Sequence, residues 1–199
     1  MSKSKTNYRD GDAFTRMSKK AGYRSRASLK LKEILKKENL LKKGMSVLDL
    51  GSFPGGWTQV IKENLDNEGL VIGVDLKKIE TIDGTFFIHK SITELKENDF
   101  EEFIEKMPFD LVLSDIAPNI SGIRETDNAR MIHLVDSVLS VVDNFLKKGG
   151  SVLIKVFQGE SLDYTRNALC NRFETCKVNK PSASRSNSKE TYLIGKRYK

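Results

Sequence analysis

Residues 46–57 read Ser-Val-Leu-Asp-Leu-Gly-Ser-Phe-Pro-Gly-Gly-Trp, and this stretch decides the fold. Its first five residues are short and mostly apolar, which predicts a buried strand over Ser46–Leu50. The glycine-rich turn that follows lets the backbone adopt positive φ and approach a ligand closely. A helix is expected directly after the turn, over Thr58–Leu65. A strand, a turn and a helix in this order are typical of a parallel α/β sheet.

The same alternation extends outward in both directions. Further strands are expected over Gly69–Leu76, Phe86–His89, Phe109–Asp115 and Ser151–Phe157. Helices are expected over 12–22, 26–41, Glu94–Met107, Asn128–Leu146 and Ser161–Arg172. The pattern therefore predicts a mostly parallel sheet with helices on both faces. Two closing strands, Glu174–Val178 and Thr191–Gly195, have no helix between them, which predicts an antiparallel hairpin at the sheet edge.

The chain's 199 residues suit a single domain. No apolar run approaches the ~20 residues that a membrane span requires, and the polar start does not resemble a secretory signal. Cys170 and Cys176 are the only cysteines and lack a CxxC spacing, so we expect two reduced thiols. These features predict a cytoplasmic protein that is not held in a membrane and binds no metal.

Charge is divided along the chain. Residues 1–45 carry a balance of +10 and residues 177–199 a balance of +6, whereas residues 46–176 carry −9. Two basic ends on an acidic body indicate contact with a polyanion. The plainer alternative is a solvated tail at each end, and we accept it for residues 1–6. Apolar residues between the lysines and arginines argue against it for residues 23–43 and 180–199.

The glycine-rich turn is a candidate cofactor site, because ligands of such sheets bind at the carboxyl ends of the strands. Asp75 ends the second strand, 24 residues after Gly51, and an acid near this spacing can accept hydrogen bonds from a ribose. The sequence has no G-x-G-x-x-G and no G-K-[ST], which disfavours dinucleotide and ATP phosphates. A nucleoside ligand without phosphates, such as S-adenosyl-L-methionine, fits better. The alternative is a tight turn with no ligand.

Two polar residues stand out in apolar strands. Lys155 interrupts the apolar run 152–157, and a charged residue is rarely buried in a central strand without a partner. Asp115 ends a strand at the ligand-bearing edge, where it is a candidate site residue or a helix-capping residue. His89 and His133 are interpreted as structural, and Trp57 has a core-packing alternative.

Six blocks of the sequence, in this order and spacing, resemble the FtsJ/RrmJ family of ribosomal RNA 2′-O-methyltransferases. The blocks are 22–27 (GYRSRA), 49–57 (DLGSFPGGW), 114–119 (SDIAPN), 155–159 (KVFQG), 181–185 (PSASR) and 188–190 (SKE). The resemblance implies a Rossmann-like S-adenosylmethionine methyltransferase fold, a seven-stranded mostly parallel sheet with an antiparallel last strand. It also implies one catalytic domain over 23–199, preceded by a basic N-terminal segment, 1–22.

The resemblance assigns the site residues. It implies a catalytic tetrad of Lys30, Asp115, Lys155 and Glu190, with Lys155 as general base. Two lysines in one site make chemical sense, because a second cation disfavours the charged form of a lysine. The implied cofactor-binding residues are Gly51, Pro54, Gly55, Gly56, Trp57, Asp75, Ser91 and Asp115. Ser91 stands where the family tends to have an acid, and Ser28-Leu29 stands where it usually has an aromatic pair.

The expected reaction is S-adenosylmethionine-dependent 2′-O-methylation of a uridine ribose in 23S rRNA. The resemblance implies the assembled large ribosomal subunit as partner, and we expect a monomer. The basic N-terminal helices and the loop of Arg185 and Lys189 are expected to contact phosphates. Three alternatives stay open: the same chemistry on tRNA or another RNA, a non-catalytic ribosome-assembly factor, and a nicotinamide-dependent oxidoreductase.

Overall fold

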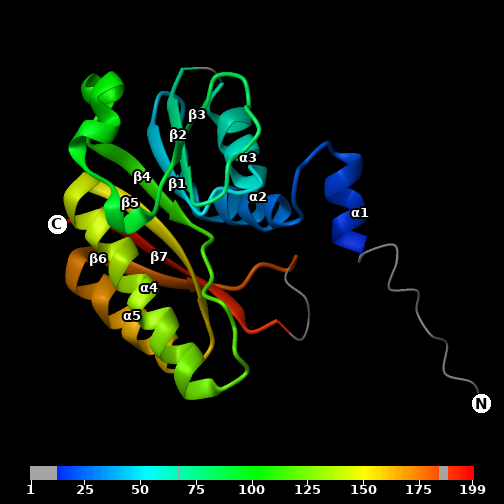
Figure 1. Cartoon of the computed structure of the whole chain (residues 1–199), viewed down its shortest axis with the longest axis vertical. Coiled ribbons are helices and arrows are strands. Elements are labelled where there is room, and N and C mark those ends of the chain that lie inside the picture. Colours follow the sequence, from blue (N-terminus) through cyan, green and yellow to red (C-terminus); the bar gives the residue numbers. More distant parts are fainter. Residues whose placement is uncertain (1–12, 67, 184–187) are drawn as a thin grey trace, which may run out of the picture.

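The computed structural model of the chain describes residues 13–66, 68–183 and 188–199. Within these ranges seven strands form one sheet, in the order β3-β2-β1-β4-β5-β7-β6 (Figure 1). The strands are β1 (Ser46–Leu50), β2 (Leu70–Asp75), β3 (Phe86–His89), β4 (Phe109–Ser114), β5 (Leu146–Phe157), β6 (Phe173–Asn179) and β7 (Glu190–Tyr198). The α-helices are α1 (Ala13–Lys20), α2 (Ala27–Glu38), α3 (Gly56–Leu65), α4 (Arg124–Phe145) and α5 (Glu160–Arg172).

The strand directions confirm the predicted sheet. β1 pairs in parallel with β2 and β4, and the parallel pairing continues to β3 on one side and β5 on the other. β7 is antiparallel to both of its neighbours, β5 and β6. The predicted hairpin is therefore confirmed: β6 lies at the sheet edge, and β7 returns between β6 and β5.

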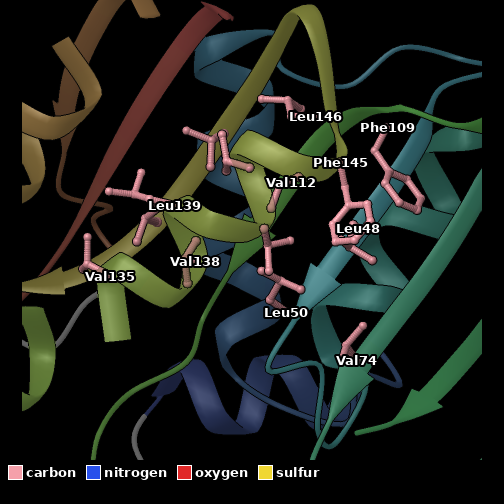
Figure 2. Close-up of a cluster of buried hydrophobic side chains, with 14 of the residues drawn as sticks. Leu48, Leu50, Val74, Phe109, Val112, Val135, Val138, Leu139, Phe145 and Leu146 are labelled. Atoms are coloured by element: carbon pink, nitrogen blue, oxygen red, sulfur yellow. The ribbon is translucent and has the colours of Figure 1, made fainter. Parts of the chain in front are cut away.

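Helices cover both faces of the sheet, as predicted. α4 and α5 pack on one face and α2 and α3 on the other (Figure 1). Neighbouring residues of β4 serve opposite faces: Val112 packs in the cluster under α4, shown in Figure 2, and Leu111 and Leu113 pack toward α2 and α3. This burial on both faces explains why the central strands are almost continuously apolar.

Three predicted elements differ from the structure in helix type or by four or more residues at a boundary. The predicted helix Glu94–Met107 is instead two 3₁₀ helices, Ile92–Glu94 and Glu97–Lys106. Phe100 and Phe103 both pack into the core from the second one, and their spacing of three residues matches the 3₁₀ repeat. The predicted helix Asn128–Leu146 begins four residues earlier, at Arg124, and β5 begins at Leu146 rather than Ser151, with a register shift beside β4. The first predicted helix begins at residue 12, outside the described residues.

After β1 the chain continues to α3, on one face of the sheet. After β4 it continues to α4, on the opposite face. β1 and β4 are neighbours in the sheet, so the crevice beyond their carboxyl ends lies where the connections change side. Ligands of doubly wound sheets bind at such a switch point. The fold thus places the glycine-rich turn and Asp115, which follow these two strands, side by side.

Candidate active site

The turn after β1 is held against β2 and β4. The amide of Gly51 donates to the carbonyl of Val74, at 2.8 Å, and the amide of Asp115 donates to the carbonyl of Leu50, at 3.2 Å. Gly51 has a φ of +74°, and a Cβ there would lie 2.4 Å from Cγ1 of Ile116. Both conformation and space therefore require glycine at this position.

The second half of the turn packs against the start of α2. Gly55 has a φ of +106°, and a Cβ on Gly56 would lie 2.3 Å from Oγ of Ser25 and 2.7 Å from Oγ of Ser28. The buried Ser28 hydroxyl donates to the carbonyl of Gly56 at 2.9 Å. Ser28 therefore ties the helix that carries Lys30 to the turn, a role that the sequence did not indicate.

A cavity of about 370 Å³ opens beside this turn. It is lined by Gly51, Val74, Asp75, Leu76, Lys90, Ser91, Ile92, Thr93, Ile116, Pro118, Arg130, His133, Leu134 and Ser137. Three expected cofactor residues, Gly51, Asp75 and Ser91, thus meet at one cavity. The rest of the turn, 54–57, does not line it. The volume lies within the range of small-molecule sites.

Asp75 and Ser91 both hold local backbone in place. The Asp75 carboxylate accepts hydrogen bonds from the amides of Phe53, at 3.0 Å, and Lys77, at 2.8 Å. The Ser91 hydroxyl accepts one from the amide of Thr93, at 3.3 Å, and caps the first 3₁₀ helix. Carboxylate oxygens have further lone pairs, so Asp75 can still accept hydrogen bonds from a ligand.

A buried carboxyl group lies under the turn. Asp49 is fully buried and accepts a hydrogen bond from the Thr58 hydroxyl, at 2.7 Å. Its Oδ1 has no hydrogen-bond partner within the described part of the chain. Burial, together with the smaller effects of the Asp115 and Asp75 charges, raises the pKa of Asp49 to about 7 against the Thr58 hydrogen bond. Of these three acids only Asp75 lines the cavity, together with the basic side chains of Lys90 and Arg130.

The four expected tetrad residues come together from α2, β5, β7 and the end of β4. Lys155 Nζ lies 3.1 Å from Oδ1 of Asp115 and donates to the backbone carbonyl of the same residue. Lys30 Nζ donates to Oε2 of Glu190. Lys30 and Lys155 are 4% and 7% exposed, so the structure buries two lysines in one site. Buried lysines are rare, and each is paired with a carboxylate here.

Each carboxylate of the tetrad is affected by both lysines. Burial alone would raise the pKa of Glu190, but the hydrogen bond and charge of Lys30 and the charge of Lys155 outweigh it and lower that pKa. Burial raises the pKa of Asp115, and the charges of Lys155 and Lys30 oppose the rise. The four groups therefore form one electrostatic unit rather than two separate ion pairs.

Two aromatic residues pack beneath the tetrad. The Tyr192 hydroxyl donates to Oδ1 of Asp115 at 3.3 Å, and burial, followed by the charges of Asp115 and Glu190, raises the pKa of Tyr192. Trp57 is 3% exposed, and its indole N–H donates to the carbonyl of Ala27 at 3.0 Å. The rings of Trp57 and Tyr192 are 6.0 Å apart. Trp57 thus supports α2 from the core, in line with its alternative interpretation.

The matching family model, described as an FtsJ-like methyltransferase, covers residues 23–198. The chain belongs to the FtsJ-like methyltransferase family. It is 40% identical over 185 residues to ribosomal RNA large subunit methyltransferase E of Xanthomonas campestris pv. campestris strain B100. The same identity holds for the enzyme of that name from Stenotrophomonas maltophilia strain K279a. Each match covers 92% of this chain and 88% of the relative.

Solved structures agree with this family. A crystal structure of a ribosomal RNA methyltransferase from Plasmodium falciparum matches with a TM-score of 0.81 and 29% identity. The match covers 88% of this chain and 98% of that one. The predicted family and the Rossmann-like methyltransferase fold are therefore confirmed.

Several residues that line the cavity of this FtsJ-like methyltransferase were missed by sequence analysis. Arg130, His133 and Ser137 lie on one stripe of α4, three to four residues apart. The same spacing also describes a helix face that packs on a core, so periodicity alone does not single these residues out. His133 was interpreted as structural, and the structure places it at the cavity.

Within residues 13–66, 68–183 and 188–199 no helix has the length and hydropathy to cross a membrane. No cluster of three or more acidic, histidine or cysteine side chains there could hold a metal ion. Arg185, expected at the substrate loop, lies outside the described residues, and its neighbour Lys189 is exposed.

Proposed function

We propose that this methyltransferase transfers a methyl group from S-adenosylmethionine to a ribose 2′-hydroxyl of RNA. The observation that carries the proposal is the pair of buried lysines, Lys30 and Lys155, held by Glu190 and Asp115. Methyl transfer to a hydroxyl needs a group that removes the hydroxyl proton during attack. A lysine amine fixed next to the cofactor cavity is suited to that role.

The cavity fits S-adenosylmethionine in size and charge. The carboxylate of Asp75 lines the cavity and attracts a cation, and the sulfonium of this cofactor is one. Asp75 is placed to accept hydrogen bonds from ribose hydroxyls, and the apolar side chains of Ile92 and Ile116 are available to the adenine. When bound, the cofactor would supply an electrophilic methyl group.

The tetrad residues have separate roles in removing the hydroxyl proton and positioning the reacting groups. In its uncharged form, which the neighbouring charge of Lys30 favours, Nζ of Lys155 takes the proton of the 2′-hydroxyl as the oxygen attacks. Oδ1 of Asp115 holds that amine in place at 3.1 Å, and Tyr192 holds the carboxylate in turn. Lys30, fixed by Glu190, adds a second positive charge beside the reacting oxygen. Positioning of this kind can lower a barrier by several kcal/mol.

We further propose a uridine of large-subunit rRNA as the substrate, within the assembled ribosomal subunit. The names of the relatives support large-subunit rRNA. Exposed lysines of α1 and α2, such as Lys19, Lys20, Lys36 and Lys37, support contact with phosphates. We also propose a cytoplasmic, monomeric enzyme with a basic N-terminal segment, 1–22, and a catalytic domain, 23–199.

The test is methyl transfer from labelled S-adenosylmethionine to large ribosomal subunits from cells that lack the activity. Naked rRNA and tRNA are assayed in parallel. Lys155→Ala removes the proposed base, and Lys148→Ala, at the exposed start of the same strand, is the matched control. We expect label in the subunits with the wild type and the control, and a loss of about 10²-fold or more with Lys155→Ala.

Three other outcomes would each refute one part of the proposed function. Label in tRNA alone would keep the chemistry and refute the rRNA substrate. Equal rates for Lys155→Ala and the wild type would refute Lys155 as the base. Cofactor binding without label in any of the RNAs would refute the catalytic proposal for these substrates and favour an assembly factor.

A further inference from the structure

A second cavity, of about 410 Å³, opens beyond the carboxyl ends of β4 and β5. We call it the Asn128 pocket; it is lined by Ile120, Gly122, Arg124, Asp127, Asn128, Met131, Phe157, Gln158, Ser161 and Lys189. It shares no lining residue with the cofactor cavity. Its residues come from the β4–α4 loop, the start of α4, the β5–α5 connection and the residue before β7.

The Asn128 pocket lies next to the tetrad along two strands. Phe157 follows Lys155 by two residues in β5, and it is paired with Glu190 in β7. Lys189 directly precedes Glu190, and its carbonyl accepts a hydrogen bond from the amide of Gln158 at 2.9 Å. A polymer whose reacting unit sits at the tetrad therefore has its neighbouring unit beside this pocket.

Hydrogen bonds within the β4–α4 loop fix one wall of the pocket. Asp127 accepts hydrogen bonds from the Ser121 amide, at 2.7 Å, the Ser121 hydroxyl, at 2.8 Å, and the Gly122 amide, at 3.0 Å. Arg130 donates to the carbonyl of Asn119 at 2.9 Å. These bonds fix the loop that follows Asp115 and occupy the Asp127 carboxylate, so the one acid that lines the pocket is engaged in holding the loop.

The remaining lining groups have the chemistry that binds a nucleotide. Phe157 is a half-buried aromatic surface on which a base can stack, and the buried Met131 forms the apolar floor behind it. The side-chain amides of Asn128 and Gln158 have no hydrogen-bond partner within the described residues, and both can donate to and accept from a base edge. Arg124 and Lys189 are exposed cations that attract a phosphate.

We propose that the Asn128 pocket binds the nucleotide of the RNA strand adjacent to the methylated one. The base stacks on Phe157 and is hydrogen-bonded by Asn128 and Gln158. This inference rests on the proposed function, because it takes the tetrad as the place of the reacting ribose. It gives the enzyme a base-reading site that is separate from both the tetrad and the cofactor cavity.

Photo-crosslinking tests the inference without methyl transfer. A short single-stranded RNA with 4-thiouridine next to a target uridine is irradiated with the full-length protein, and the linked peptides are identified by mass spectrometry. We expect links within residues 124–131 or 157–161. The double variant Asn128→Ala, Gln158→Ala should lose them, whereas Asn144→Ala, an exposed asparagine near the other end of α4, should keep them.

Steady-state kinetics give a second readout. The double variant should raise the KM for RNA about ten-fold, which corresponds to the loss of one or two net hydrogen bonds. Its affinity for S-adenosylmethionine should match the wild type, because that cavity shares no residue with the Asn128 pocket. An unchanged cofactor affinity also shows that the variant is folded.

The outcomes separate this inference from the proposed function. Methyl transfer by the wild type with links only to α1 or α2, and an unchanged KM for the double variant, would refute the pocket and leave the function standing. Links within the pocket but no methyl transfer to any RNA would support the pocket as an RNA site and refute the catalytic proposal.

Discussion

Replacing Asp49 by asparagine tests the electrostatics under the cofactor turn. Asparagine has the shape of a protonated aspartic acid and stays neutral at every pH. Burial raises the pKa of Asp49 from the ordinary 3.8 to about 7 in the folded protein. The folded state therefore binds the Asp49 proton more tightly than the unfolded state does, and the contribution of Asp49 to the stability of the wild type falls as pH rises between these two values.

The magnitude follows from the two pKa values. A gap of one pH unit corresponds to about 1.4 kcal/mol, so the gap from 3.8 to about 7 amounts to about 4 kcal/mol. This penalty is absent below pH 3.8, grows up to about pH 7 and is constant above it. Asp49→Asn lacks the penalty, so its free energy of unfolding, relative to the wild type, should rise by up to about 4 kcal/mol over the same interval.

The assay is denaturant unfolding at several pH values from 4 to 8, followed by far-UV circular dichroism. Asp83→Asn, an exposed aspartate on the β2–β3 loop, is the control and should follow the wild type at every pH. A difference between Asp49→Asn and the wild type that stays flat with pH, or falls as pH rises, would refute the reasoning about buried charge at this turn.

Three further perturbations follow from the site. Lys155→Ala should reduce the methylation rate by about 10²-fold to 10⁴-fold and leave S-adenosylmethionine affinity intact; a parallel loss of affinity, seen by calorimetry, would argue for a structural role. Gly51→Ala places a Cβ 2.4 Å from Ile116 at a φ of +74°, so it should cost about 1–3 kcal/mol of stability and weaken cofactor binding; wild-type values in both would contradict the close approach. Glu33→Ala removes the hydrogen bonds to the amide and hydroxyl of Ser182, so amide exchange at Ser182 should accelerate; unchanged exchange would show that another contact holds the loop.

The sequence predicted the elements whose signal is local. The apolar run Ser46–Leu50 and the turn after it lie where expected, because a strand buried on both faces and a ligand-approaching glycine both have strong sequence signatures. Lys155 was also recognisable, since a lysine inside an apolar strand needs a partner. The structure supplies that partner, Asp115.

Other features depend on contacts between distant residues. Lys30 and Glu190 are 160 positions apart, and each resembles an ordinary surface residue in the sequence; only the family resemblance indicated them, and the fold pairs them. The hydroxyl of Ser28 and the place of His133 at the cavity likewise depend on packing between elements. The 3₁₀ geometry of Glu97–Lys106 was missed because its apolar spacing resembles that of an α-helix.

The most direct test of the central proposal is the chemical position of the transferred methyl group. Large ribosomal subunits from cells that lack the activity are incubated with the protein and labelled S-adenosylmethionine, and the rRNA is then digested to nucleosides and analysed by mass spectrometry. The tetrad predicts label in 2′-O-methyluridine, formed at least about 10²-fold more slowly by Lys155→Ala. Label on a base, or label in 2′-O-methyluridine that is unaffected by Lys155→Ala, would contradict a ribose methyltransferase that works through the buried lysine tetrad.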